Sequence, residues 1–305
     1  MSSLTMSARV RSLPGRVRGL PLLRPFAERD FRIFWLGENV SVLGDQFHFI
    51  ALAWLTLQLT GSGLALGGVL MAAAIPRAIF ILLGGAISDR RQPKQVIFVS
   101  NALRAVVATV IAVLVLSGRT ELWQIAVMAV VFGTVDAFFY PAIGSFLPLL
   151  VTSERLPASN ALFQATNQLL GLIGPALAGL TVAIIGTGPA FALDAGSFVV
   201  AAVAIVLVRG GLRAIASPAA PVEASFSGHA ARPSMLATIR QGANYAFRDH
   251  GLRTLLLLAT ALNVAFTGPI SVGLPWLSAN RFDAGSAGFG LMASGFGAGA
   301  LIGAI

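Results

Sequence analysis

The sequence contains no cysteine and little charge. None of its 305 residues is Cys, so disulfide bonds and thiolate metal sites are excluded. Charged residues make up 11% of the chain, hydrophobic residues 56%, and the mean hydropathy is +0.82. A soluble domain carries about 25% charged residues. We therefore expect a polytopic membrane protein.

Histidine is scarce, and a phosphate-binding loop is missing. His48, His229 and His250 are far apart, and no Gly-x-x-x-x-Gly-Lys sequence occurs. Neither an ATPase nor a metal hydrolase is indicated, and we expect no catalytic activity, metal or cofactor. If the protein moves a solute uphill, the energy has to come from an ion gradient, which requires ionisable groups within the spans.

The basic residues are distributed as in a membrane protein. The formal net charge is +9, and 17 of the 21 Lys and Arg residues lie in four segments that we assign to the cytoplasm. These segments are the tail 1–32, the loop around 90–94, the loop at Arg155 and the linker 209–253. The asymmetry predicts a plasma (inner) membrane protein with a cytoplasmic N-terminus and favours the lipid bilayer over nucleic acid as its partner.

Eight apolar segments are long enough to cross a bilayer, which requires about 20 residues. Six form a first half at 33–208, and two lie at 254–305, after a linker at 209–253 whose part 234–248 has the spacing of a membrane-surface helix. Pro141 and Pro148 should end the fourth span. The predicted spans are 33–59, 64–87, 96–117, 122–140, 158–185, 189–208, 254–277 and 287–305.

A compact charged turn separates the second and third spans. Residues 85–94 read Gly-Ala-Ile-Ser-Asp-Arg-Arg-Gln-Pro-Lys, and the three bases mark the cytoplasmic side. Gly85 should allow two helices to approach closely.

The pattern Gly-x-x-x-Asp-Arg with a further base resembles the loop signature of the major facilitator superfamily of transporters. The resemblance implies a gating role for its matching residues, although Gln92 and Pro93 depart from the family pattern. The matching residues are Gly85, Asp89, Arg90 and Lys94.

A second motif, in the fifth span, resembles the signature of the superfamily's exporters. Residues 171–179 read Gly-Leu-Ile-Gly-Pro-Ala-Leu-Ala-Gly. The glycines predict close helix packing and Pro175 a kink, although any Gly-rich helix interface has these properties. The matching residues are Gly171, Gly174, Pro175 and Gly179.

Three shorter sequences extend the resemblance to the macrolide-efflux and enterobactin-exporter branch. They are Leu-Gly-Asp45, Glu-Arg-Leu-Pro-Ala-Ser-Asn160 and Ala-Leu-Asp194. The resemblance implies an all-α bundle of the major facilitator type, with the first six-helix half followed by the first two helices of the second half.

An internal repeat supports two halves. Trp54-Leu55, Gly67 and Leu70-Met71 recur as Trp276-Leu277, Gly288 and Leu291-Met292, offset by 221 or 222 residues. The second half begins as a copy of the first. We expect a C-terminally truncated protein of twelve spans.

Several ionisable residues lie within the spans. At 1.5 Å per residue, Asp45 and Arg77 both lie roughly 18 to 20 Å from the cytoplasmic side. They could form a structural ion pair between the first two spans or a proton or substrate site that the pairing tunes. Asp136 could meet Arg90 or Arg91 when an inner gate closes, with Arg104 as a competing partner. Asp194, predicted near the outer surface, and Glu38, near the inner surface, are further candidates.

One face of the fifth span is polar. Asn160, Gln164, Asn167 and Gln168 follow a spacing of three and four and could line a substrate path, with Phe138, Phe139 and Trp54 supplying apolar contact area. The alternatives are interhelical hydrogen bonds and lipid-facing aromatics.

These observations predict a proton-coupled secondary transporter, acting as a monomer, that exports small hydrophobic or amphipathic compounds by alternating access. A lipid or lysophospholipid flippase of the same fold is the first alternative. A non-transporting membrane scaffold or sensor is an alternative of another class.

Overall fold

The computed structural model describes residues 21–88, 92–209 and 244–303, and the regular elements in these ranges are all helical. Seven of the helical segments are long and apolar enough to cross a membrane. The chain is therefore an all-α multi-pass membrane protein. The main helices are α1 (Arg29–Thr60), α2 (Gly63–Ser88), α3 (Pro93–Leu116), α4 (Leu122–Phe146), α5 (Leu156–Ile185), α6 (Thr187–Leu207), α8 (His250–Gly268), α9 (Leu274–Asn280) and α10 (Gly285–Ile302).

Short helical turns join or precede these helices. A 3-10 turn, η1 (Pro21–Ala27), precedes α1, and the turns η2 (Leu147–Leu149) and η3 (Ser153–Arg155) lie between α4 and α5. The π-helical segment η6 (Pro269–Gly273) connects α8 to α9, so the predicted seventh span is three helical pieces in continuous succession.

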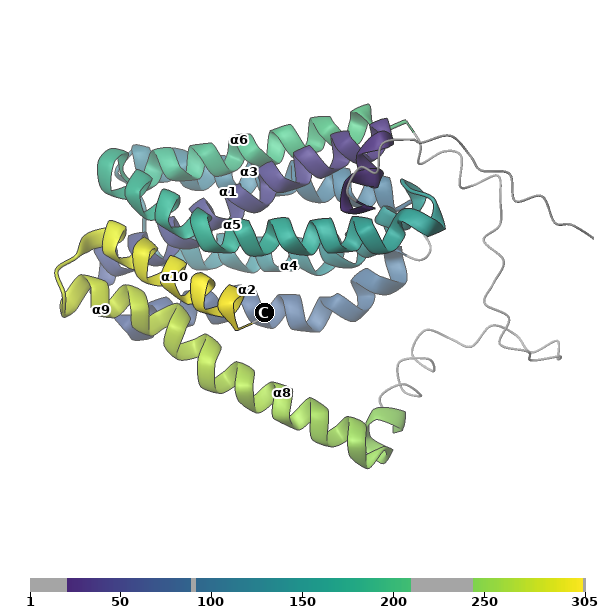
Figure 1. Ribbon diagram of the computed structural model, residues 1–305. Helices are drawn as coiled ribbons and strands as arrows, with labels where there is room; N and C mark the ends of the chain where they lie inside the picture. Colours follow the sequence, from purple (N-terminus) through teal and green to yellow (C-terminus); the bar gives the residue numbers. More distant parts are fainter. Residues whose placement is uncertain (1–20, 89–91, 210–243, 304–305) are drawn as a thin grey trace, which may run out of the picture.

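The first six long helices form one bundle. Helix α1 packs against α5 and α6, α2 packs against α4, and α3 contacts both α4 and α6 (Figure 1). Residues far apart in the chain, on α1 and α6, therefore lie side by side. This arrangement brings the polar residues of separate spans to common depths.

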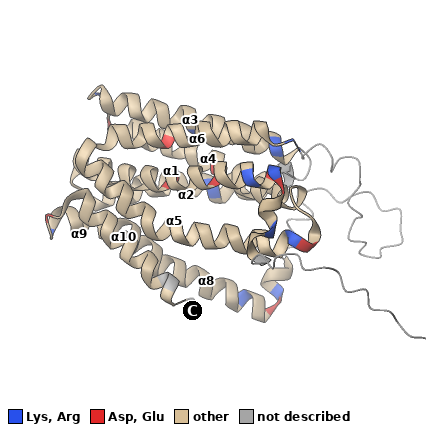
Figure 2. Ribbon diagram, turned by 45° about the horizontal axis from the view of Figure 1, so that its top comes forward, with Lys and Arg blue, Asp and Glu red and all other residues tan. Residues whose placement is uncertain are grey.

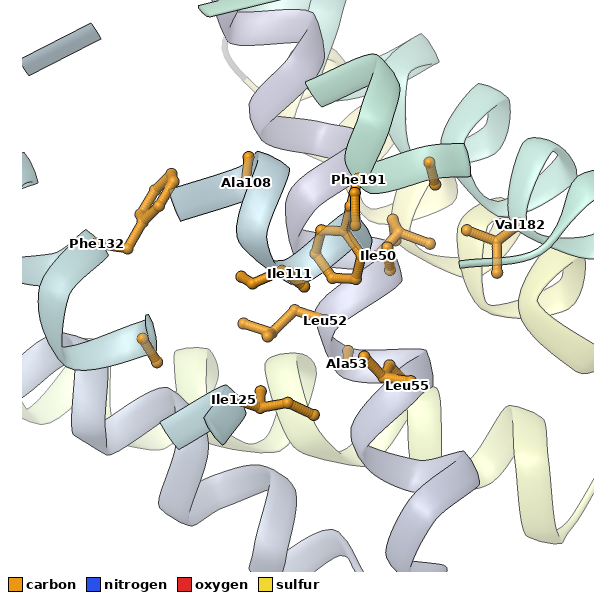
Figure 3. Close-up of a cluster of buried hydrophobic side chains, with 14 of the residues drawn as sticks. Ile50, Leu52, Ala53, Leu55, Ala108, Ile111, Ile125, Phe132, Val182 and Phe191 are labelled. Atoms are coloured by element: carbon orange, nitrogen blue, oxygen red, sulfur yellow. The ribbon is translucent and has the colours of Figure 1, made fainter. Parts of the chain in front are cut away.

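An apolar cluster fills one end of the bundle. Figure 3 shows Ile50 and Leu52 of α1, Ile111 of α3, Phe132 of α4 and Phe191 of α6 converging from four helices. Ile50 and Phe191 have no exposed surface. In a bilayer the gain comes from close van der Waals packing between helices, because lipid tails are as apolar as the side chains.

A proline and a glycine together produce one of the closest helix contacts. The sequence predicted that Pro141 would end α4, but α4 continues to Phe146, so that prediction was wrong. Pro141 has no N–H to donate to the carbonyl of Ala137, four residues earlier. Gly84 of α2 lies against this carbonyl, where a β-carbon would collide with it. The tight neighbour contact offsets the missing hydrogen bond.

The same contact corrects the role predicted for Gly85. No described atom lies within 4 Å of the position that a β-carbon on Gly85 would occupy. Gly84, its neighbour, is the residue that allows α2 and α4 to approach. The two glycines differ because successive helix positions point about 100° apart.

Helices α8 and α10 behave differently towards the bundle. None of the described residues of α8 is buried, and α8 extends away from the bundle in Figure 1. Helix α10 instead packs along α5. The part of the chain after the linker therefore contacts the first half mainly through α10, with smaller contacts of α9 with α1 and of η6 with α2.

The charges gather at one end of the bundle, where Lys and Arg colour the ends of several helices (Figure 2). Lys94, assigned above to a gating loop, donates from Nζ to the carbonyl oxygen of Val208 at 2.5 Å. A cation at the carboxyl end of α6 is favourable because it satisfies terminal carbonyls and the helix dipole. Asp89 and Arg90 lie outside the described residues, as does most of the predicted surface helix 234–248.

Candidate functional site

The guanidinium of Arg104 is one of the most deeply buried charges in the described part of the chain. Arg104 of α3 is 1% exposed, and its Nη2 donates to Oδ1 of Asp136 in α4. The guanidinium carbon lies 3.8 Å from the ring centroid of Phe139, a favourable cation–π contact. Arg104, named in the prediction as a competing partner, contacts Asp136, while Arg90 and Arg91 lie outside the described residues.

Asp136 also faces a second guanidinium. Nη1 of Arg77 in α2 lies 4.0 Å from Asp136 Oδ2, and the Arg77 guanidinium carbon lies 4.6 Å from the ring centroid of Tyr140. The side chain of Arg77 is 45% exposed. Sequence reasoning predicted that Arg77 would face Asp45, but no ion pair joins them within 4.0 Å, because α2 packs on α4 and makes few contacts with α1.

A second polar pair lies between α1 and α6. His48 Nδ1 is 2.8 Å from Asp194 Oδ2, and both residues are buried. The imidazole stacks on Phe132 with ring centroids 4.2 Å apart. Asp194, predicted near the outer surface of the membrane, lies within two turns of the start of α6 at Thr187, and its side chain is buried between the helices.

A glycine in α1 makes the second pair possible. A β-carbon on Gly44 would collide with Oγ of Ser197 and come within 3.0 Å of Asp194 Oδ1. Gly44 lies one helical turn before His48, so the close approach of α1 and α6 at this turn sets the distance between His48 and Asp194.

Two further carboxyl groups lie on the polar face of α1. Glu38 is 8% exposed and Asp45 is half-buried. Arg104, Asp194, Asp136 and His48 all act electrostatically on the Asp45 carboxylate. Asp45 therefore interacts with both the Arg104–Asp136 pair and the His48–Asp194 pair. Sequence reasoning missed His48, although its spacing of three from Asp45 already placed both residues on one face of α1.

The amide residues of α5 are exposed on the described bundle. Asn160, Gln164 and Asn167 are all exposed, as is Gln168. None of their side chains takes part in a hydrogen bond with another described residue. A row of free amides is costly in contact with lipid, so this face is suited to a water-filled path or to a facing helix.

The aromatic candidates lie in different environments. Phe139 is 2% exposed and packs on Arg104, while Trp54 is half-buried beside the apolar cluster. Phe138 lines a shallow groove of about 410 Å³ between α3 and α4. These three residues therefore do not form a common surface.

The fifth-span motif connects the bundle to α10. β-carbons on Gly179 and Gly290 would collide with the main chain of the opposite helix, while Gly174 faces Gln46 of α1. Ser294 Oγ of α10 accepts a hydrogen bond from the Ala176 N–H at 2.9 Å. The carbonyl of Gly171, which receives no N–H from Pro175, lies against Gly297. The motif is thus a helix interface across the two parts of the chain.

Comparison with known proteins gives consistent matches. The sequence profile of a family described as transmembrane secretion effector matches residues 21–305. Macrolide efflux protein A of Streptococcus pyogenes is 22% identical over 275 residues, which cover 90% of this chain and 65% of that protein. Multidrug efflux pump Tap of Mycolicibacterium fortuitum is 27% identical over 268 residues, covering 86% and 62%. The chain thus spans less than two thirds of the length of these relatives.

Proposed function

Since the chain belongs to the transmembrane secretion effector family of the major facilitator superfamily, we propose that the protein is a secondary active transporter that exports small hydrophobic or amphipathic compounds. The names of these relatives point to macrolides and other drugs as the first compounds to test. The family and these names indicate a transporter rather than an enzyme.

One observation carries the proposal: the charged centre formed by Arg77, Arg104 and Asp136 at mid-bundle. Ionisable groups inside a membrane are costly and usually mark a path for a substrate or an ion. Arg77 is exposed on the bundle surface while its partner Asp136 is buried. A cation in the middle of a span cannot face lipid at low cost, so this surface is better suited to a second bundle or an aqueous cavity.

The substrate path in this proposal runs along the exposed faces of α2, α4 and α5. Arg77 and Tyr140 supply a cation and an aromatic ring, and Asn160, Gln164 and Asn167 supply amide groups nearer the cytoplasmic end. An amphipathic compound needs both apolar contact and a few polar partners. Exchange for protons would drive export, and the bundle would rock against a second bundle in alternating access.

The contact between α5 and α10 supports such a movement. Where the two helices come closest, glycines of one helix lie against main-chain atoms of the other. A smooth seam of small residues lets one helix slide along another without breaking a large set of contacts.

To test this proposal, the full-length protein is expressed in a macrolide-sensitive bacterium from which the main drug pump of that bacterium has been deleted. We expect a raised inhibitory concentration for erythromycin and lower accumulation of labelled erythromycin, with both effects abolished by a protonophore. Arg77→Ala should remove them, whereas Arg281→Ala, in the loop before α10, should not. Unchanged accumulation in cells with normal protein levels, across a panel of macrolides and cationic dyes, would refute drug export.

A further inference from the structure

The interior of the six-helix bundle contains more acidic than basic groups. Two guanidinium groups, those of Arg77 and Arg104, face four carboxyl groups within the described spans. A net negative charge in a medium of low dielectric constant is unfavourable. The excess is reduced most simply by binding positive charge. The four carboxyl groups belong to Glu38, Asp45, Asp136 and Asp194.

His48 is the remaining titratable base in this interior, and its surroundings suit a cation. Asp194 Oδ2 is 2.8 Å from His48 Nδ1. Phe132 stacks on the imidazole with an interplanar angle of 19°, and Phe191 meets it edge-on at 5.5 Å. The second carboxylate oxygen, Asp194 Oδ1, is buried without a hydrogen-bond partner among the described residues. Aromatic faces and an adjacent carboxylate both stabilise an imidazolium.

We propose that His48 and Asp194 form the site that binds the transported proton, an inference that rests on the proton-coupled export proposed above. Asp194 accepts a hydrogen bond from the His48 Nδ1–H, which fixes the tautomer and leaves Nε2 as the basic nitrogen. The arriving proton binds Nε2 and converts the imidazole into an imidazolium. The pair is then neutral as a whole, and the excess negative charge of the interior falls by one.

Asp45 connects this site to the substrate surface. It lies three residues before His48 on the same helix and is half-buried, so it can pass protons between the exposed side of the bundle and the pair. Its carboxylate is also close to Arg104 and Asp136, whose other neighbour is the exposed Arg77. A substrate that changes the field at Arg77 therefore changes the affinity of the pair for its proton, which is the condition for coupling.

The charged groups that act on the pair come from four helices. Helix α1 supplies Asp45, α3 supplies Arg104, α4 supplies Asp136, and α6 supplies Asp194 itself. The described residues contain no group of three or more His, Asp or Glu side chains arranged to hold a metal ion.

The test reconstitutes the full-length protein into liposomes and compares two readouts with labelled erythromycin. Exchange of labelled for unlabelled drug needs no net proton movement. Accumulation of the drug inside liposomes with an acidic interior does need net proton movement, outward in exchange for the drug. A one-to-one exchange supports about tenfold accumulation per unit of pH difference. His48→Gln and Asp194→Asn should keep exchange and lose accumulation. His250→Gln and Asp283→Asn, at exposed positions, should behave as wild type in both.

Wild-type accumulation in His48→Gln would overturn the assignment, as would accumulation that follows a Na⁺ gradient instead of pH. If neither variant folds, the wild-type protein in weakly buffered detergent must still release protons when erythromycin is added, and absence of release would also overturn it. Failure of the proposed function is distinguishable, because wild type then shows no exchange at all. In that case acid–base titration decides. Wild type must take up one proton more than His48→Gln, and the Asp194→Asn variant must lack this extra proton.

Discussion

Gly290 of α10 lies against the main-chain carbonyl of Pro175 in α5, at a position where any β-carbon would collide with it. Two residues separated by the whole linker 209–253 thus form one of the tightest contacts in the described part of the molecule. The contact shows that the fifth-span motif joins the six-helix bundle to the chain beyond the linker.

A larger residue at Gly290 should therefore separate α10 from α5. Gly290→Val forces the helices apart, and overpacking of this kind costs about 1 to 3 kcal/mol. We expect a lower melting temperature in detergent and loss of drug resistance. Gly295→Val, on the same helix with no described neighbour within 4 Å, is the control. Equal melting temperatures for the two variants would contradict the contact.

The distance between α1 and α6 should depend on Gly44. Gly44→Ala places a methyl group onto Ser197, which displaces His48 from Asp194, and we expect lower stability and weaker transport. The double variant Gly44→Ala/Ser197→Gly removes the opposing side chain and should recover most of both. Gly68→Ala, in α2 with no neighbour within 4 Å, serves as the reference. If the double variant is no more stable and transports no better than Gly44→Ala, the clash with Ser197 is not the cause of the loss.

The buried Arg104–Asp136 pair should be far more sensitive than an exposed pair. Arg104→Gln leaves Asp136 with only the distant Arg77, and breaking a buried pair costs about 3 to 5 kcal/mol. Arg29→Gln removes the exposed contact with Asp30, a 3.4 Å pair, and should cost at most about 1 kcal/mol. Unfolding in mixed detergent micelles measures both. A similar decrease in the free energy of unfolding for the two variants would mean that water screens the charge of Arg104.

The polar face of α5 should be accessible to water, in contrast to the apolar face of α6. The protein has no cysteine, so single cysteines can be introduced without background. Gln164→Cys should react with a membrane-impermeant maleimide in inside-out vesicles, because a thiolate forms in an aqueous path. Val200→Cys is also exposed on the bundle, at 48%, and lies at a similar depth. It should not react, because it faces lipid; equal labelling would argue against a path along α5.

The predicted spans agree with the helices to within a few residues at most ends, because long apolar runs between charged loops report directly on the bilayer. The predicted end of α4 at Pro141 was wrong, since a proline in a membrane helix is tolerated where a neighbouring helix packs on the freed carbonyl. Sequence reasoning named Asp136, Arg104 and Asp194 as candidates, but it paired Arg77 with Asp45 and gave His48 no role. The depth of a residue in the membrane can be estimated from the sequence, but it does not tell which helices are neighbours at that depth.

Composition and the placing of charges along the sequence determined that this chain is a multi-pass helical membrane protein, and its motifs identified the superfamily. Those properties depend on local transfer energies and on short patterns. The tertiary structure decided that Asp136 belongs to Arg104 and Arg77, that His48 belongs to Asp194, and that Gly84 rather than Gly85 lies at the contact with α4. Each depends on helix order and rotation within the bundle, which side-chain packing between distant segments sets.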